Sequence, residues 1–248
     1  REMALIGETL AHTAFAGVAI GILVTSSTGW NGSLLLVALV VGILGALVVQ
    51  WLTERTDAYG DVPIAIMLSG SFAVGTLIIS YGDGLTGVNI RGYLFGNLAV
   101  VTPQGARLMG VLSLLVVAGV ALTYKQLLFI TFDEQAARVA QLNVTGYNTL
   151  LVVLTAVVVV GAMQVLGVIL VAAMLVVPVA AASQVARSFR ETMYLAVIFG
   201  QISVIGGFAV SIGLGLPSGG SIVVTAIAVY LASIVGAGFS VNAISSHG

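Results

Sequence analysis

Two side chains near the start of the sequence could bind a metal ion or transfer a proton. Glu8 and His12 stand four residues apart in the stretch GETLAHTAFAG, which is otherwise typical of a membrane-spanning helix. Residues at positions i and i+4 of a helix are neighbours on one face, so the carboxylate and the imidazole lie close together. A carboxylate oxygen combined with an imidazole nitrogen suits Zn²⁺, Mn²⁺ or Fe²⁺.

The expected depth of this pair in a membrane makes it unusual. At about 1.5 Å per residue, His12 lies roughly 16 Å from Arg1, near the bilayer midplane if Arg1 marks the inner surface. Ionisable groups at that depth usually mark an ion path, a proton relay or a buried pair. We expect no lysine or arginine at the same depth, so a bound cation is the expected partner of Glu8. The alternative is that Glu8 and His12 only form hydrogen bonds with each other or with a neighbouring helix.

Two donor side chains do not complete a metal site. Zn²⁺ takes about four ligands and Mn²⁺ about six. In a homodimer with this helix beside the two-fold axis, two copies of Glu8 and His12 would supply four ligands. The neighbours Ala11, Ala14, Ala16 and Gly17 are small and would leave room at the axis. The pattern therefore predicts a metal site that two subunits share.

The composition places these residues in a membrane protein. Of 248 residues, 59% are hydrophobic and only 7% are charged, whereas soluble domains carry about a quarter of charged residues. The apolar runs approach the roughly 20 residues that cross a bilayer as a helix. They do not alternate as the strands of a membrane barrel do. We therefore expect an all-α polytopic membrane protein that forms one transmembrane domain over residues 1–248.

Other function classes find little support in the sequence. The net charge of −1 gives no basic patch for nucleic acid, and the chain has no cysteine for a thiolate metal site or a cysteine nucleophile. The phosphate-binding pattern GxxxxGK[ST] does not occur, so ATP hydrolysis is not expected in this chain. We expect a protein that is not itself an enzyme.

We predict about eight transmembrane helices. They are expected at residues 4–25, 33–53, 63–81, 105–124, 147–163, 165–182, 193–213 and 221–239. A tight turn near Gln164 would separate the fifth from the sixth, so these two could form a helical hairpin. Residues 82–104 are expected on the outer face or as a re-entrant segment. Because the sequence opens with Arg1, we expect a longer protein with a possible missing N-terminal helix.

The basic residues predict the orientation of these helices. Positive side chains collect on the cytoplasmic side of a membrane. If residue 1 is cytoplasmic, six of the eight lysine and arginine residues fall on the cytoplasmic side and two on the outer side. This distribution supports that orientation, which also places the C-terminus in the cytoplasm. The inner ones are Arg1, Arg55, Lys125, Arg138, Arg187 and Arg190, and the outer ones are Arg91 and Arg107.

Two segments are expected on the cytoplasmic side. Residues 125–145 include FDEQAARVAQL, which predicts a short amphipathic helix with Asp133 and Glu134 near its start, where acids suit the helix dipole. Residues 178–192 join two spans, and Pro178 is expected to kink or break the helix there. Small residues and two arginines in this loop could dock in a groove of a cytoplasmic partner.

Three stretches together resemble a known family. ALIGETLAHTAFAGVAIG is similar to its Leu-Gly-Asp-x-x-x-His-x-x-x-x-Gly segment, and YKQLLFITFDEQAARVAQLNV to its cytoplasmic Phe-Asp-x-x-x-Ala segment. QVLGVILVAAMLVVPVAAASQVARSFRETMYLA, followed by LGLPSGGSIVV, is similar to its C-terminal half. Over essentially its whole length the chain resembles the permease subunits of zinc, manganese and iron uptake ABC transporters.

This resemblance implies roles for particular residues. It implies metal binding by Glu8 and His12, although the family usually has Asp where this chain has the longer Glu8. It also implies that the loop 178–192 contains coupling residues that seat in an ATPase. These are Pro178, Ser183, Arg187, Ser188 and Arg190, and the cytoplasmic family segment contributes Phe132, Asp133 and Glu134.

The resemblance also implies partners and a location. It implies a homodimer with two cytoplasmic ATP-binding subunits and an extracytoplasmic metal-binding protein, spanning the cell membrane several times. No permanently bound cofactor is expected, because the metal (Mn, Zn or Fe) is cargo. Our functional hypothesis is the permease of an ATP-driven importer of a divalent transition metal. The alternatives are a proton-coupled secondary transporter, an ABC permease for a larger metal chelate, and a membrane subunit that transports nothing itself.

Overall fold

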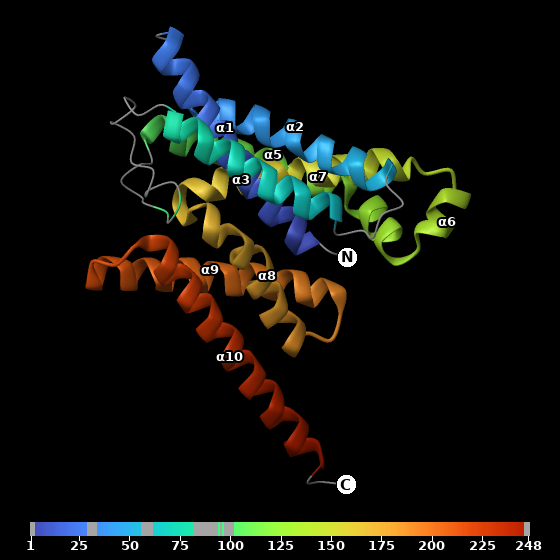
Figure 1. Ribbon diagram of the computed structural model, residues 1–248. Coiled ribbons are helices and arrows are strands. Elements are labelled where there is room, and N and C mark those ends of the chain that lie inside the picture. The colour runs from blue at the N-terminus through green and yellow to red at the C-terminus, as the bar shows by residue number, and fades with distance from the viewer. Residues whose placement is uncertain are drawn as a thin grey trace. The chain divides into compact units, whose positions relative to one another are not determined.

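The structure, a computed structural model, describes residues 3–28, 34–55, 62–81, 94, 96 and 102–245. Throughout these residues the regular elements are helices, with no strand (Figure 1). They are α1 (Met3–Thr28), α2 (Leu34–Arg55), α3 (Val62–Tyr81), α5 (Pro103–Phe132), α6 (Glu134–Val139), α7 (Val144–Leu166), α8 (Val168–Val185), α9 (Phe189–Leu214) and α10 (Ser218–Ser245).

The helices agree with the predicted spans in place and type. Each of the eight predicted apolar segments falls on a long helix, and the all-α expectation is confirmed for the described residues. Among these residues, six helices are long and apolar enough to cross a membrane, and α3 and α8 contain shorter apolar stretches, Ile64–Ser80 and Leu170–Val185. The number of eight transmembrane helices therefore stays a prediction. Most of the predicted outer segment 82–104 lies outside the described residues.

Helix α5 is longer than the predicted span. The apolar run 105–124 predicted its first part, but the helix continues to Phe132 and has 30 residues. At about 1.5 Å per residue it is roughly 45 Å long, whereas a bilayer core is about 30 Å thick. Helix α5 is therefore longer than an untilted span requires, and it leads directly into α6.

The described chain packs as two compact units, and the first contains Arg1–Asn89 and Val101–Ala162. Within it, α1 packs along both α2 and α3 (Figure 1). The side chains of Leu10, Ala11 and Ala14 are fully buried, so α1 forms the interior of this unit. The single permease domain predicted over 1–248 stays a prediction.

The segment between α5 and α7 has its own small core. Buried Ile130, Ala137 and Val144 form an apolar cluster, and Leu142 and Tyr147 pack against it. The expected amphipathic helix in 132–142 is present as the six-residue α6. The cluster holds α6 against the end of α5 and the start of α7.

The second unit contains Ile90–Val100 and Met163–Gly248, and its helices α8, α9 and α10 contact one another. Helices α9 and α10 approach closely at Gly207, where an added Cβ would lie 2.3 Å from the Cα atom of Ile222. Gly96 is buried in the same unit, and a Cβ there would lie 2.3 Å from the carbonyl oxygen of Val165. Small residues allow these backbones to meet.

The break between α7 and α8 and the course of α8 through Pro178 differ in detail from the predictions. The break between the helices lies at Gly167, three residues after Gln164, and its φ of 84° and ψ of 155° are accessible mainly to glycine. Pro178 does not break the span, because α8 continues through it to Val185, and a kink at Pro178 stays a prediction. A proline inside a helix removes one backbone hydrogen bond, and membrane helices tolerate this when neighbouring groups satisfy the backbone.

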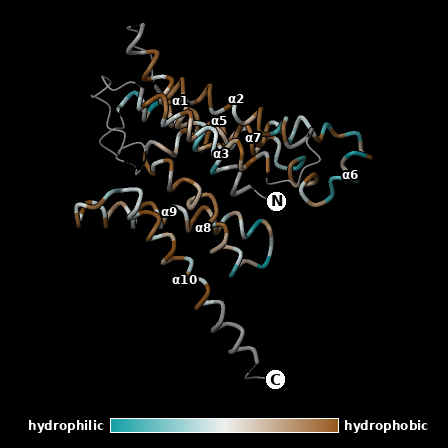
Figure 2. Tube along the Cα trace, in the orientation of Figure 1, coloured by the Kyte–Doolittle hydropathy of each residue, from teal (hydrophilic) through white to brown (hydrophobic). Residues whose placement is uncertain are grey.

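Large apolar side chains cover much of the outside of the helices. Leu114, Leu122 and Ile205 are 71%, 82% and 67% exposed, respectively. Figure 2 shows hydrophobic residues along the long helices and hydrophilic ones around α6 and between α8 and α9. Apolar surface on this scale is typical of contact with lipid or another subunit, so the chain is a multi-pass membrane protein.

Candidate functional site

Glu8 and His12 lie on α1, one turn apart, within the apolar window Gly7–Val24. Both side chains are half-buried, whereas their neighbours Leu10 and Ala11 are fully buried. The pair is therefore at the edge of the packed surface of α1 and not in its centre. Both side chains therefore keep part of their surface exposed in the described chain.

The Nδ1 atom of His12 is buried and has no hydrogen-bond partner among the described residues. Buried polar atoms are nearly always paired, so an unpaired one calls for an explanation such as an absent ion. A neutral imidazole nitrogen carries the lone pair that transition metals bind. The donor chemistry of Glu8 and His12 therefore fits a divalent transition metal.

One copy of the described chain does not complete such a site. No group of three or more His, Cys, Asp or Glu side chains that could hold a metal occurs in the part that the structure describes. Metal binding by the two donors that the sequence indicates, Glu8 and His12, stays a prediction. Further ligands would have to come from water, the cargo's own ligands or another molecule.

The cationic residues of the described chain lie away from this pair in sequence and at helix ends or connections. Arg55 is the last residue of α2, Arg107 lies in the second turn of α5, and Lys125 lies in the last third of α5. Arg187 and Arg190 flank the start of α9. No described span therefore carries a lysine or arginine in its middle.

Helix α1 is fixed to α3 by a buried series of hydroxyl contacts. Thr9 Oγ1 donates to the carbonyl oxygen of Ile64 at 3.3 Å, and Thr13 Oγ1 donates to that of Thr9 at 2.8 Å. Thr13 Oγ1 also lies 3.3 Å from Ser71 Oγ, which donates to the carbonyl oxygen of Met67. On α1, Thr9 directly follows Glu8 and Thr13 directly follows His12. Their hydroxyl contacts therefore hold the helix that carries the pair in one register against α3.

The predicted coupling segment is a tight turn between two helices. Only residues 186–188 lie outside α8 and α9. Ser188 is the N-cap of α9, and its Oγ accepts from the backbone N–H of Glu191 at 3.3 Å. The carboxylate of Glu191 accepts from the backbone N–H of Arg187 at 2.8 Å. These bonds fix the backbone of the turn and leave the Arg187 and Arg190 side chains exposed.

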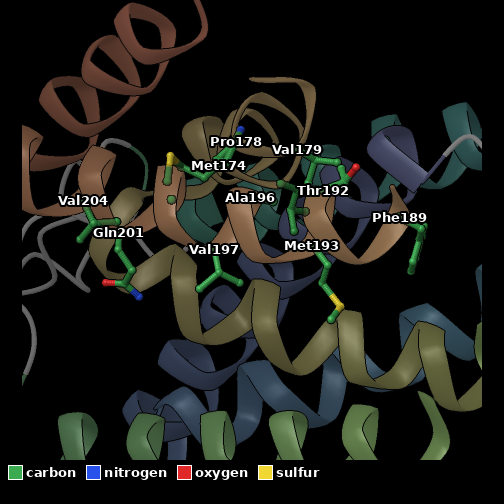
Figure 3. Close-up of a pocket in the computed structure, with 12 residues that line it drawn as sticks. Met174, Pro178, Val179, Phe189, Thr192, Met193, Ala196, Val197, Gln201 and Val204 are labelled. Atoms are coloured by element: carbon green, nitrogen blue, oxygen red, sulfur yellow. The ribbon is translucent and has the colours of Figure 1, made fainter. Parts of the chain in front are cut away.

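The other predicted coupling residues have different surroundings. Ser183 is exposed in the last turn of α8, and its Oγ donates to the carbonyl oxygen of Ala180 at 2.8 Å. Pro178 is buried and lines a groove of about 530 Å³ between α8 and α9 (Figure 3). The groove is mainly apolar, with Thr192 and Gln201 as its polar members, and it extends to Phe189 beside the turn. Pro178 therefore belongs to the groove and not to the turn.

The three residues that were predicted for a cytoplasmic segment have structural roles in the fold. Phe132 ends α5 and is 70% exposed. Asp133 is the N-cap of α6, and its Oδ1 accepts from the backbone N–H of Ala136 at 2.8 Å. Glu134 pairs with Arg138 at 2.9 Å on the surface of α6. Asp133 and Glu134 thus begin and stabilise α6.

Sequence reasoning missed two residues near these sites. Glu191 holds the turn, and the pattern Ser-x-x-Glu at residues 188–191 is a helix-start signal that could have indicated it. Phe72 contacts the ring of His12 from α3. The sequence could not have indicated Phe72, because one apolar residue within an apolar run does not reveal which residue it contacts.

Comparisons with known proteins agree on the kind of protein. The sequence model of the ABC 3 transport family matches residues 1–237. A probable metal transport system membrane protein of Treponema pallidum is 31% identical over 220 residues, which cover 89% of this chain and 80% of the relative. The manganese transport system membrane protein MntC of Halalkalibacterium halodurans is 31% identical over 226 residues, covering 91% and 75%.

A zinc relative and a solved structure extend the comparison. The high-affinity zinc uptake system membrane protein ZnuB of Haemophilus influenzae is 25% identical over 234 residues, covering 94% of this chain and 87% of the relative. The structure of PsaBC from Streptococcus pneumoniae in complex with Fab matches with a TM-score of 0.80 and 29% identity, covering 94% of this chain and 81% of that one. With its apolar helices and a family match along nearly its whole length, the chain belongs to the ABC 3 transport family.

Proposed function

We propose that this chain is the permease subunit of an ATP-driven importer of a divalent transition metal in the cell membrane. The observation that carries this proposal is the pair Glu8 and His12, with the buried and unpartnered Nδ1 atom of His12 in a membrane helix. Relatives named for manganese and zinc transport support the class of cargo. They do not separate manganese from zinc, and iron stays a third candidate.

In this proposal, Glu8 and His12 hold the metal briefly as it crosses the membrane. A second copy of the chain brings its own pair to the same site, because one copy supplies only two donors. A transport site must bind the ion strongly enough to admit it and weakly enough to release it. A site of few ligands, assembled between two subunits, meets both conditions, since separating the subunits removes half of the ligands.

ATP hydrolysis belongs to separate cytoplasmic subunits in this proposal, because the sequence lacks a phosphate-binding loop. The turn at residues 186–188 is the contact with them. Its exposed Arg187 and Arg190 would meet the partner, while Ser188 and Glu191 hold the backbone in place. An extracytoplasmic metal-binding protein would deliver the ion, and the chain's C-terminus would lie in the cytoplasm.

The test is uptake of radioactive Mn²⁺ and Zn²⁺ by cells that carry E8A or H12A. We expect either change to lower uptake by at least about tenfold, because removing a ligand of a two-donor subunit removes half of its contribution to binding. The variant T28A at the end of the same helix serves as a control and should leave uptake unchanged. Uptake at the wild-type level in both E8A and H12A, at equal protein abundance, would contradict the metal site.

A further inference from the structure

The ring of Phe72 on α3 contacts the ring of His12 on α1. Their centroids are 5.1 Å apart and their planes are nearly perpendicular, at 87°. This edge-to-face arrangement is one of the favoured geometries for aromatic pairs. Rotation of the imidazole about its Cβ–Cγ bond would displace Phe72, so the contact favours one orientation of the His12 ring.

A second aromatic side chain of α1 also contacts Phe72. The ring of Phe15 stacks on it with the centroids 5.9 Å apart and an interplanar angle of 28°. Phe15 fits against the backbone of α3 because residue 75 is glycine: a Cβ there would lie 2.9 Å from Phe15 Cδ1. His12 and Phe15 lie on α1, whereas Phe72 and Gly75 lie on α3. Both helices therefore contribute contacts that position the ring of Phe72.

The register that brings the two rings together is also fixed. Thr13, the residue after His12, meets Ser71, the residue before Phe72, with their hydroxyl oxygens 3.3 Å apart. One turn earlier, Thr9 donates to the carbonyl oxygen of Ile64. Both contacts advance in the same direction along α1 and α3, which therefore run parallel here. Sliding one helix past the other would break these bonds in an apolar medium that offers no water to replace them.

We propose that Phe72 is a positioning residue for metal binding, which sets the orientation of the His12 imidazole. The inference rests on the proposed function, in which His12 binds the metal. Phe72 has no lone pair and is not a ligand. It acts by holding the ring in its binding orientation before the ion arrives, so that less conformational freedom is lost on binding. Its side chain is 40% exposed, so the ring is held by these few contacts and not by complete burial.

The experiment measures Mn²⁺ binding to the purified transporter without other metals. Free aqueous Mn²⁺ has a strong electron paramagnetic resonance signal that falls when the ion binds, so a titration gives the dissociation constant. F72L removes the ring and keeps apolar bulk, and we expect it to raise the dissociation constant about 3- to 10-fold, the equivalent of one lost aromatic contact. F72Y keeps the ring and should restore binding to within about twofold of the wild type.

Two further variants separate positioning from general stability. F208L changes a phenylalanine of similar exposure, 37%, on α9 and should leave the dissociation constant unchanged. F72M supplies flexible apolar bulk in place of the ring. It should weaken Mn²⁺ binding as F72L does, and it replaces F72L in the comparison if that variant does not fold.

The possible outcomes distinguish this inference from the proposed function. Loss of binding in H12A with weaker binding in F72L and recovery in F72Y supports both. Loss of binding in H12A with wild-type binding in F72L and F72M overturns the role of Phe72 and leaves the metal site standing. Wild-type binding in H12A overturns the metal site, and the role of Phe72 with it. Equal weakening in F72L and F72Y also overturns positioning by the aromatic ring.

Discussion

Helix α1 packs tightly against α2, whereas α8 and α9 leave a groove between them. At Gly17 of α1, an added Cβ would lie 2.9 Å from the Cα atom of Ala38 on α2, so the two backbones are in contact. At Gly200 of α9, the nearest atom to an added Cβ is the Cβ of Pro178, 4.0 Å away, and both residues line the groove between α8 and α9. An added methyl group would therefore clash with the neighbouring backbone at Gly17, whereas the groove could accept one at Gly200.

This difference matches what each region does in the proposed transporter. A metal site needs ligands held within a narrow range of positions, which tight packing of α1 provides. A segment that transmits a conformational change from the ATP-binding subunits needs a rigid contact with them, next to helices that can move. The turn at 186–188 is firm because Glu191 and Ser188 fix it, and the groove behind it leaves α8 and α9 room to move against each other.

Substitution in the packed region should have the largest effect on stability. G17A places a methyl group against the backbone of α2, which cannot move aside as a side chain can. We expect a loss of about 1–3 kcal/mol of stability, as for other overpacked cores, measured by thermal unfolding in detergent. G70A on α3 is the matched control, because no atom lies within 4 Å of its added Cβ. Equal melting temperatures for the two variants would show that α1 is not packed to its limit.

Removal of the bond that holds the α8–α9 turn should have an intermediate effect. E191A deletes the carboxylate that accepts from the backbone N–H of Arg187. We expect a loss of about 1 kcal/mol, the usual worth of a hydrogen bond at a helix start, and weaker retention of ATPase subunits during purification. The control E134A breaks the exposed ion pair of α6 and should lose no more than about 0.5 kcal/mol. A larger loss in E134A than in E191A would contradict the role given to Glu191.

The sequence predicted the long helices well because each one contains a long apolar run. It placed the end of α5 near residue 124, since Lys125 interrupts the apolar run, but a single charged residue does not end a helix, and α5 continues to Phe132. It also predicted a kink or break at Pro178, because proline is a strong helix breaker in water. In an apolar medium an exposed, unpaired backbone is worse than a helix with one bond missing, and α8 continues.

The candidate site was predictable in part for a related reason. Glu8 and His12 are conspicuous because ionisable residues are costly in an apolar helix. Phe72 and Glu191 were not predicted. The contact of Phe72 with His12 joins residues 60 positions apart, and only the parallel packing of α1 and α3 brings them together. Glu191 lies in a recognisable helix-start pattern, but its bond to the Arg187 backbone depends on the conformation of the turn.

The smallest expected effect is a gain in stability, and it concerns the groove between α8 and α9. G200A adds a methyl group to the groove, where it would meet Pro178 at ordinary contact distance, 4.0 Å. Alanine is better than glycine inside a helix by about 0.5–1 kcal/mol, so G200A should raise the melting temperature slightly. If the groove serves movement of α8 against α9, the same variant should slow metal-dependent ATP hydrolysis by the assembled transporter, because the added contact favours one arrangement. A lower melting temperature would mean that α8 and α9 are already in full contact at Gly200, and the contrast with α1 would then fail.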